Sequence, residues 1–196
     1  MSNLFAKLEK EAFRAGIKPR TRESREWFRN KIKTMRGREI NRQQLMKESE
    51  LIKTDRSIAG HMYMFFYDPK TKDTLPYYDR FPLVIVVGPA KGGFYGLNLH
   101  YLPPALRAKF LDELMSITNN KRYDESTRFR LSYEFMKKSS KMKYFAPCFK
   151  HYLTEHVRGQ FAKVQAPEYE IAVFLPTADF AKASSAKVYG DSRRMI

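Results

Sequence analysis

The chain has 196 residues, of which 43% are hydrophobic and 14% aromatic, and this composition can bury a sizeable core and excludes wholesale disorder. Its 37 Lys and Arg outnumber its 21 Asp and Glu, and the resulting net charge of +16 favours a large anionic partner. That partner could be nucleic acid, an anionic membrane surface or an acidic protein, although a protein that is basic only for solubility remains an alternative.

The compartment is indicated by what the sequence lacks. The single cysteine, Cys148, excludes an internal disulfide and fits a reducing environment. The first ten residues contain no apolar stretch of signal-peptide length, and no window approaches the ~20 apolar residues of a membrane span. We therefore expect a protein that stays inside a cell, or is packaged into something assembled there, and that has no membrane partner.

Residues 1–58 form a basic region for which we expect helices. Apolar side chains at positions 4, 5, 8, 12 and 13 have helical spacing, and Gly16 can end that helix. Thr21 can cap a second helix that ends near Gly37, and a short third helix is expected near residues 41–51. Trp27 lies on the apolar side of the second helix, and the opposite side of this helix is rich in arginine. This pattern predicts an amphipathic, basic helical hairpin.

The middle of the chain has the pattern of strands. Residues 62–67 are apolar and aromatic and are followed by Asp-Pro, and residues 81–87 form a β-branched, apolar run. Residues 94–101 return after a loop containing Gly92 and Gly93. We expect an antiparallel hairpin in a small sheet.

The later part of the chain is predicted to be mostly helical. Pro103-Pro104 starts a helix whose apolar face runs to position 117, a second helix is expected from about residue 124, and a third over residues 147–159. Residues 169–175 resemble a last strand, and we expect residues 179–196 to be an extended tail.

These expectations define an α+β fold. It has a small, mainly antiparallel sheet or partial barrel from residues 61–102 and 168–176, with the helices of residues 103–160 packed on it and the basic helical hairpin before it. We divide the chain into the N-terminal region 1–58, a core domain 59–178 and the tail 179–196.

No motif in the sequence requires catalysis, a cofactor, a small-molecule substrate or a metal. The glycines at 92, 93 and 96 do not form a phosphate-binding loop and fit a hairpin turn. Cys148 and a histidine could be drawn as a nucleophile and base, but Cys148 is better explained as a small buried hydrophobe. A metal-dependent nuclease would need clustered carboxylates, and Asp68, Asp73 and Asp79 fit turns and caps instead.

The basic hairpin is the best candidate for function, because arginine and lysine contact phosphates without reading sequence. The candidate phosphate contacts are Arg20, Arg22, Arg25, Arg29, Lys31, Lys33, Arg36 and Arg38. Trp27, Tyr77 and Tyr78 are weaker candidates for stacking on exposed bases at a duplex end, and Trp27 also fits the core.

Two stretches, residues 67–83 (YDPKTKDTLPYYDRFPL) and 92–102 (GGFYGLNLHYL), carry a resemblance to a known family. Shorter strings at residues 119–121 (NNK) and 147–150 (PCFK) extend it. With these stretches the chain resembles the DNA end protectors, or small virion structural proteins, of T-even-type contractile-tailed phages. The resemblance implies a non-enzymatic virion component near the end of the packaged genome that shields this end from exonuclease, and it transfers no binding residues.

We therefore expect sequence-independent DNA binding by a virion protein that assembles in the bacterial host cytoplasm with other virion proteins, near the head–tail junction. The alternatives are an architectural neck, tail or baseplate subunit that docks on acidic protein neighbours without binding DNA, and, third, a nuclease.

Overall fold

The computed structural model describes residues 4–35, 40–52, 58–118, 134–135, 138, 143–165 and 168–195. Its strands are β1 (Glu50–Ile52), β2 (Met62–Tyr67), β3 (Tyr78–Asp79), β4 (Leu83–Ala90), β5 (Gly93–Asn98), β6 (Phe149–Leu153), β7 (Val157–Val164) and β8 (Phe180–Ala181). Its α-helices are α1 (Leu4–Arg14), α2 (Arg22–Thr34), α3 (Arg42–Glu48), α4 (Pro104–Thr118), α6 (Tyr169–Ala172) and α7 (Ser185–Met195). Short 3-10 turns are η2 (Leu99–Tyr101), η3 (Lys143–Cys148) and η4 (Thr154–His156).

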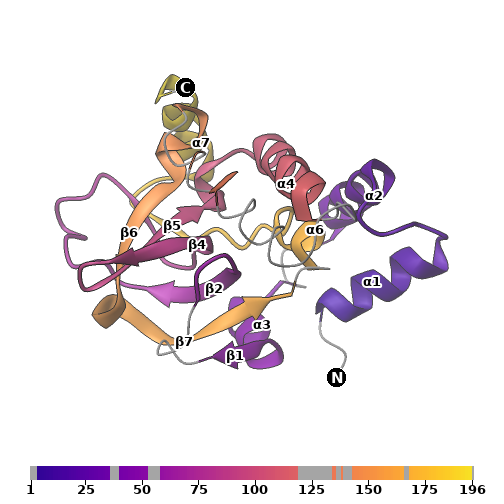
Figure 1. Ribbon diagram of the computed structural model, residues 1–196, viewed down its shortest axis with the longest axis horizontal. Coiled ribbons are helices and arrows are strands. Elements are labelled where there is room, and N and C mark those ends of the chain that lie inside the picture. Colours follow the sequence, from indigo (N-terminus) through magenta and orange to yellow (C-terminus); the bar gives the residue numbers. More distant parts are fainter. Residues whose placement is uncertain are drawn as a thin grey trace.

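The main sheet has six strands in the order β1-β7-β2-β4-β5-β6, and every neighbouring pair is antiparallel. Strands β3 and β8 form a separate two-stranded ribbon. The helices lie mainly to one side of the sheet, as Figure 1 shows for α1, α2, α4 and α6. This open, mainly antiparallel sheet with packed helices confirms the α+β prediction.

One face of the sheet closes over an aromatic cluster. Phe65 on β2 is fully buried, and its ring centroid lies 4.8 Å from that of Phe161 on β7 and 5.4 Å from that of Tyr152 on β6. Phe94 on β5 lies 5.9 Å away. Because Phe65 contacts rings from three other strands, the sheet must curve around this cluster, and edge-to-face packing of the rings stabilises the curvature.

The other face of the sheet packs against the helices. The larger buried cluster contains side chains of β2, β4 and β5 together with Phe5 and Leu8 of α1, Phe28 of α2, Leu45 of α3 and Phe110 of α4. The helices of the N-terminal region therefore bury their apolar faces in the same core as the sheet. Arg42 further joins α3 to the C-terminal part, since its side chain donates to the backbone oxygens of Thr177 and Ala178 at 2.7 and 2.8 Å.

Two segments differ from the sequence prediction in type. Residues 149–153 and 157–164 form β6 and β7, where we predicted a helix over 147–159. The apolar positions 149, 153 and 157 that suggested the helix are four residues apart, and an even spacing also places them on one face of a strand. Residues 169–172 form the helix α6 in place of the predicted strand, because a short, largely apolar run fits either structure.

The C-terminal segment also differs from expectation. The predicted extended tail contains β8 and the helix α7, which anchors itself through the buried side chains of Val188 and Ser192. The Ser192 hydroxyl donates to the Tyr101 carbonyl at 2.8 Å. The helix predicted from about residue 124 lies largely outside the described residues.

Candidate nucleic-acid interface

The helical hairpin forms as the local sequence dictates. Gly16 takes a φ of +71° just after α1, a conformation that side chains with a Cβ rarely adopt. The Thr21 hydroxyl accepts a hydrogen bond from the Ser24 amide and the Ser24 hydroxyl accepts one from the Thr21 amide, which completes a reciprocal cap at the start of α2. Two helices of the predicted basic region are thus fixed in place before any ligand binds.

Some of the cations predicted to contact phosphates are engaged within the chain. Arg25 is largely buried, and its guanidinium forms ion pairs with Asp112 on α4 and Glu170 on α6. Arg22 pairs with Glu26 at 3.3 Å and Lys31 with Glu11 at 2.7 Å. Surface pairs such as these last two are weak and can exchange for a phosphate, whereas the burial of Arg25 indicates a role in the fold.

The remaining predicted cations are more accessible. Arg29 and Lys33 are exposed on α2 and form no ion pair with any residue that the structure describes. Arg20 is exposed, with a φ of +61°, and its charge partly opposes the rise in the pKa of the Glu170 carboxyl. Arg36 and Arg38 lie outside the described residues. Of the six predicted contacts that the structure describes, Arg29 and Lys33 are therefore best placed to meet an external anion.

Glu170 explains why α2 sits where it does. Its side chain is 2% exposed, and one of its oxygens accepts from the Ser24 hydroxyl at the start of α2. Burial is the largest effect and raises the pKa of this carboxyl, while Ser24 and Arg25 act in the opposite direction. A carboxylate near a helix N-terminus is favourable, and it holds α2 against α6.

The outer face of α1 carries a basic stripe that the sequence analysis did not single out. Lys7, Lys10 and Arg14 are all exposed, and none forms an ion pair with the described residues. At 3.6 residues per turn they point away from the buried side chains of Phe5, Leu8 and Ala12. The sequence could have predicted this basic stripe from the helical period, because that period places both glutamates of α1 beside the buried face and the three cations opposite it.

Phe13 lies on this same exposed side of α1. We grouped it with the apolar positions of helical spacing, but its side chain is 82% exposed. At 100° per residue it points about 100° away from Ala12, past the edge of the buried face. We call the exposed set Lys7, Lys10, Phe13 and Arg14 the outer face of α1.

The aromatic side chains proposed for base stacking are mostly packed within the chain. Tyr77 is half-buried, and its ring lies 6.1 Å from that of Tyr101 and 6.5 Å from that of Phe180. Trp27 packs against the core and meets Phe28 edge-on at 5.2 Å. Tyr78 is half-buried in the β3–β8 ribbon.

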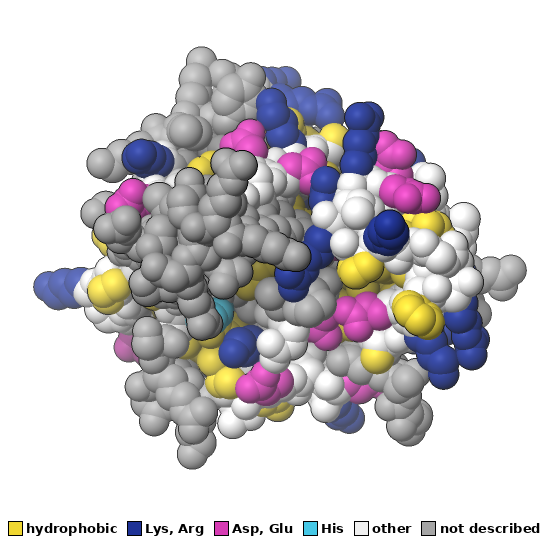
Figure 2. All heavy atoms as spheres, turned by 45° about the vertical axis from the view of Figure 1, so that its right-hand side comes forward, with side chains coloured by type: hydrophobic (Ala, Val, Ile, Leu, Met, Phe, Trp, Pro, Cys, Tyr) yellow, Lys and Arg dark blue, Asp and Glu magenta, His cyan; other side chains and the backbone are white. Residues whose placement is uncertain are grey.

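The charge of the hairpin does not gather in one dense patch. Figure 2 shows the side of the molecule on which α1 and α2 lie, and its coloured Lys and Arg side chains are spread over the face with Asp and Glu among them. The outer face of α2 includes Glu23 and Glu26, whereas that of α1 contains no carboxylate. The outer face of α1 is therefore the more uniformly basic of the two.

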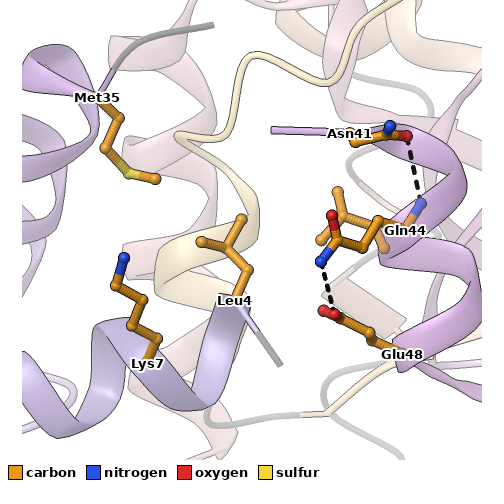
Figure 3. A pocket seen from close by; sticks show the side chains of 7 residues that line it. Leu4, Lys7, Met35, Asn41, Gln44 and Glu48 are labelled. Carbon is orange, nitrogen blue, oxygen red and sulfur yellow. Dashed lines mark hydrogen bonds between the residues drawn. The ribbon is translucent and has the colours of Figure 1, made fainter. Parts of the chain in front are cut away.

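A small pocket of about 160 Å³ lies between α1, α3 and the end of α2 (Figure 3). Leu4, Met35 and Leu45 give it apolar walls. Its polar groups are committed to one another, since Asn41 accepts from the Gln44 amide and the Gln44 side chain donates to Glu48 at 2.8 Å. Lys7 reaches over one side, and such a lining offers no converging charges to a nucleotide.

A buried polar cluster lies at the far end of β5. Asp79 and His100 are nearly inaccessible, and the Asp79 carboxylate lies 2.7 Å from His100 Nδ1. His100 Nε2 lies 3.1 Å from the hydroxyl of Thr177. This order of carboxylate, imidazole and hydroxyl has the connectivity of a catalytic triad, but all three side chains are buried, so a substrate cannot reach them.

Burial sets the protonation of this cluster. It lowers the pKa of His100, an effect that the nearby Arg107 and Arg42 reinforce and Asp79 opposes. The pKa of Asp79 is lowered as well: burial raises it, but the charge of His100 and the hydrogen bonds from His100, Asn98 and the Asp179 amide lower it more. With its pKa lowered, His100 in the neutral form donates through Nδ1 to Asp79 and accepts from Thr177 through Nε2.

The other residues considered for catalysis or metal binding are not arranged for either role in the described chain. Cys148 is fully buried, as predicted, and burial raises the pKa of its thiol to about 12, so the sulfur is a poor nucleophile. Within the described ranges, no three His, Cys, Asp or Glu side chains are grouped to hold a metal ion. Across the same ranges, no helix has the length and apolar character of a membrane span.

With this arrangement in view, comparison with known families identifies the class of protein. Residues 1–194 match the model of the family described as phage T4 terminal DNA protecting protein. The search of curated proteins and the search of solved structures gave no match.

Since the match covers nearly the whole chain, the protein belongs to the phage T4 terminal DNA protecting protein family. The resemblance drawn from residues 67–83 and 92–102 is confirmed.

Proposed function

We propose that this protein binds duplex DNA at a genome end without reading its sequence and without catalysing a reaction. It acts as a component of the phage virion that assembles in the host cytoplasm beside other virion proteins. The family supplies the link to DNA termini, and the net charge of +16 supplies the attraction to a polyanion. The observation that carries the proposal is the outer face of α1, where three exposed cations stand without a carboxylate among them.

The phosphate contacts come from both helices of the hairpin. Lys7, Lys10 and Arg14 provide them on α1, and Arg22, Arg29 and Lys33 on α2. Lys10 and Arg14 are one turn apart, a rise of about 6 Å along the helix, and so are Arg29 and Lys33. If about six phosphates are neutralised, the logarithm of the affinity falls with the logarithm of the salt concentration with a slope of roughly −5.

The test uses labelled linear and circular duplexes of equal sequence, with and without magnesium, over a salt series. We expect binding with a steep salt dependence, tighter binding to the linear form, and no cleavage in magnesium. A slope near zero would reject phosphate contact, and cleavage that a chelator abolishes would identify a nuclease. Failure to bind either duplex at moderate salt would indicate a subunit whose basic faces dock on acidic proteins.

Two triple variants separate local contact from net charge. In the first, Lys7, Lys10 and Arg14 are changed to Gln, and in the control Lys91, Lys109 and Lys187 are changed to Gln. Both lose three positive charges from exposed positions, so long-range attraction falls equally. We expect the first to reduce the salt slope by about 2.7 and the control to leave it nearly unchanged.

A further inference from the structure

Preference for an end requires more than phosphate contact. Phosphates and sugars are alike along a duplex, so a protein that touches only these cannot distinguish an end from the interior. Interior base pairs are stacked on both faces and present only their edges in the grooves. The terminal pair alone has an open face, and the side chain suited to it is an exposed aromatic ring.

The structure describes four exposed large hydrophobic residues, and two of them, Phe13 and Tyr95, are aromatic. Tyr95 is 38% exposed, and one face of its ring stacks on Phe149, with centroids 5.2 Å apart and an interplanar angle of 20°. Phe13 is 82% exposed and makes no ring contact with the described residues. The cross-strand pair with Phe149 explains why an aromatic residue stands at position 95, whereas no contact within the described fold explains one at position 13.

The neighbours of Phe13 have the charge that a duplex end requires. Lys10 lies three residues before it and Arg14 directly after it, and both are exposed on the outer face of α1. The two glutamates of α1 flank this face: Glu9, four residues before Phe13, is half-buried, and Glu11 pairs with Lys31. An isolated exposed phenyl is unremarkable on a protein surface, but here it stands within one turn of two cations that have no ion-pair partner in the described chain.

We propose that Phe13 stacks on the open face of the terminal base pair while Lys10 and Arg14 contact the last phosphates of the strand. This inference rests on the DNA binding proposed above and names the part of the DNA that the protein recognises. A second copy of the chain is a poor alternative occupant, because its own outer face would bring another three cations against these.

The test replaces Phe13 by Ala and by Trp and compares affinities for linear and covalently closed duplexes. Phe13→Ala should lose the preference for linear DNA by on the order of 10-fold, with affinity for the circle unchanged, and Phe13→Trp should retain it. Met195→Ala removes another exposed apolar side chain, at 51% exposure on α7, and should leave the preference intact. Because Phe13 is so exposed, these variants should fold like the parent protein.

A second readout detects stacking directly. A fluorescent adenine analogue, 2-aminopurine, is placed in the terminal pair or ten pairs inward, and its emission is recorded as protein is added. The parent protein should change the emission of the terminal reporter only, and Phe13→Ala should change neither.

Several outcomes overturn the inference, and they are distinct from failure of the proposed function. Equal binding of linear and circular DNA by the parent protein, or an end preference that survives in Phe13→Ala, would remove Phe13 from end recognition while DNA binding stands. Conversion of a dimer to a monomer by Phe13→Ala would make the ring a contact between copies. Absence of any DNA binding would refute the proposed function itself.

Discussion

Asp79 is the residue whose removal should weaken the fold most, because it accepts four hydrogen bonds in a buried site. The donors are the backbone amides of Phe81 and Asp179, the Asn98 side chain and His100 Nδ1, at 2.7 to 3.1 Å. They come from the segment after β3, the end of β5, the turn η2 and the C-terminal segment. One carboxylate thus joins parts of the chain that are up to 100 residues apart.

The change Asp79→Ala leaves these donors without an acceptor. His100 can respond by changing its tautomer, but the two backbone amides cannot move away, and each unsatisfied buried donor costs about 1–3 kcal/mol. Allowing for the desolvation cost that the carboxylate no longer bears, we expect a loss of about 3–5 kcal/mol in the free energy of unfolding. For a chain of this size the loss corresponds to a decrease in melting temperature of about 6–20 °C.

The assay is urea unfolding followed by circular dichroism and by the fluorescence of the single tryptophan, Trp27. Asp73→Ala removes an exposed carboxylate from the same connection and should change the free energy of unfolding by less than about 0.5 kcal/mol. Asp79→Asn keeps an oxygen that can accept from the two backbone amides, so its free energy of unfolding should lie between those of Asp73→Ala and Asp79→Ala. A loss below about 1 kcal/mol for Asp79→Ala would show that the cluster does not hold the fold together as the hydrogen bonds indicate.

Two further predictions concern packing. Gly93→Ala should destabilise the fold by about 1–3 kcal/mol or more in urea unfolding, because a Cβ would lie 1.8 Å from the Tyr152 carbonyl oxygen and force β5 and β6 apart. Gly190→Ala on α7 has open space around it and should stabilise the fold by about 0.5–1 kcal/mol, and equal effects of the two changes would contradict the β5–β6 register. The Cys148 thiol should react with a thiol reagent only as fast as the protein unfolds, and rapid modification of the folded protein would show that the site opens locally.

Local signals predicted the elements that carry them. The strands predicted over residues 62–67, 81–87 and 94–101 formed as β2, β4 and β5, except that residues 99–101 form the turn η2. The helices that begin near residues 4, 21 and 104 formed where periodicity and caps placed them. Thr21 is an instance, because its capping role depends only on the next three residues. The predictions for residues 147–159 and 169–175 were wrong because the local patterns there fit both a helix and a strand. Long-range packing and strand pairing decided between the two structures.

The candidate site was predictable in its charge but not in its geometry. The sequence identified a basic helical hairpin, but it could not show that Arg25 turns inward, because its partners Asp112 and Glu170 are 87 and 145 residues away. It could have shown the outer face of α1, since the spacing of Lys7, Lys10 and Arg14 opposite Phe5 and Leu8 is a local helical property. The basic stripe was overlooked because Phe13 was grouped with the apolar positions of this helix.

The buried pair of Asp79 and His100 also makes stability depend on pH, and the direction follows from the two shifts. The pKa of His100 is lowered from 6.5, so between 6.5 and its folded value the unfolded chain binds a proton that the native protein does not. Stability is therefore fully present above about pH 6.5 and is lost as pH falls, by up to about 1.4 kcal/mol per pH unit for this one proton. The lowered pKa of Asp79 acts in the same direction at lower pH, where stability is lost as pH falls below 3.8. Glu170, whose pKa is raised, acts oppositely above 4.5.

Comparison with His100→Asn isolates the histidine, because Asn cannot titrate. Urea unfolding between pH 5.0 and 7.5 should give a free energy of unfolding that falls with acidification more steeply in the parent protein than in the variant. His151 is exposed, and His151→Asn should leave the parent slope unchanged. Identical slopes in the parent and His100→Asn would mean that folding does not shift the pKa of His100. A parent protein that gains stability relative to His100→Asn as pH falls would mean that His100 is protonated in the native state. Asp79 and His100 would then form an ion pair, and the tautomer assigned above, with Nε2 accepting from Thr177, would be wrong.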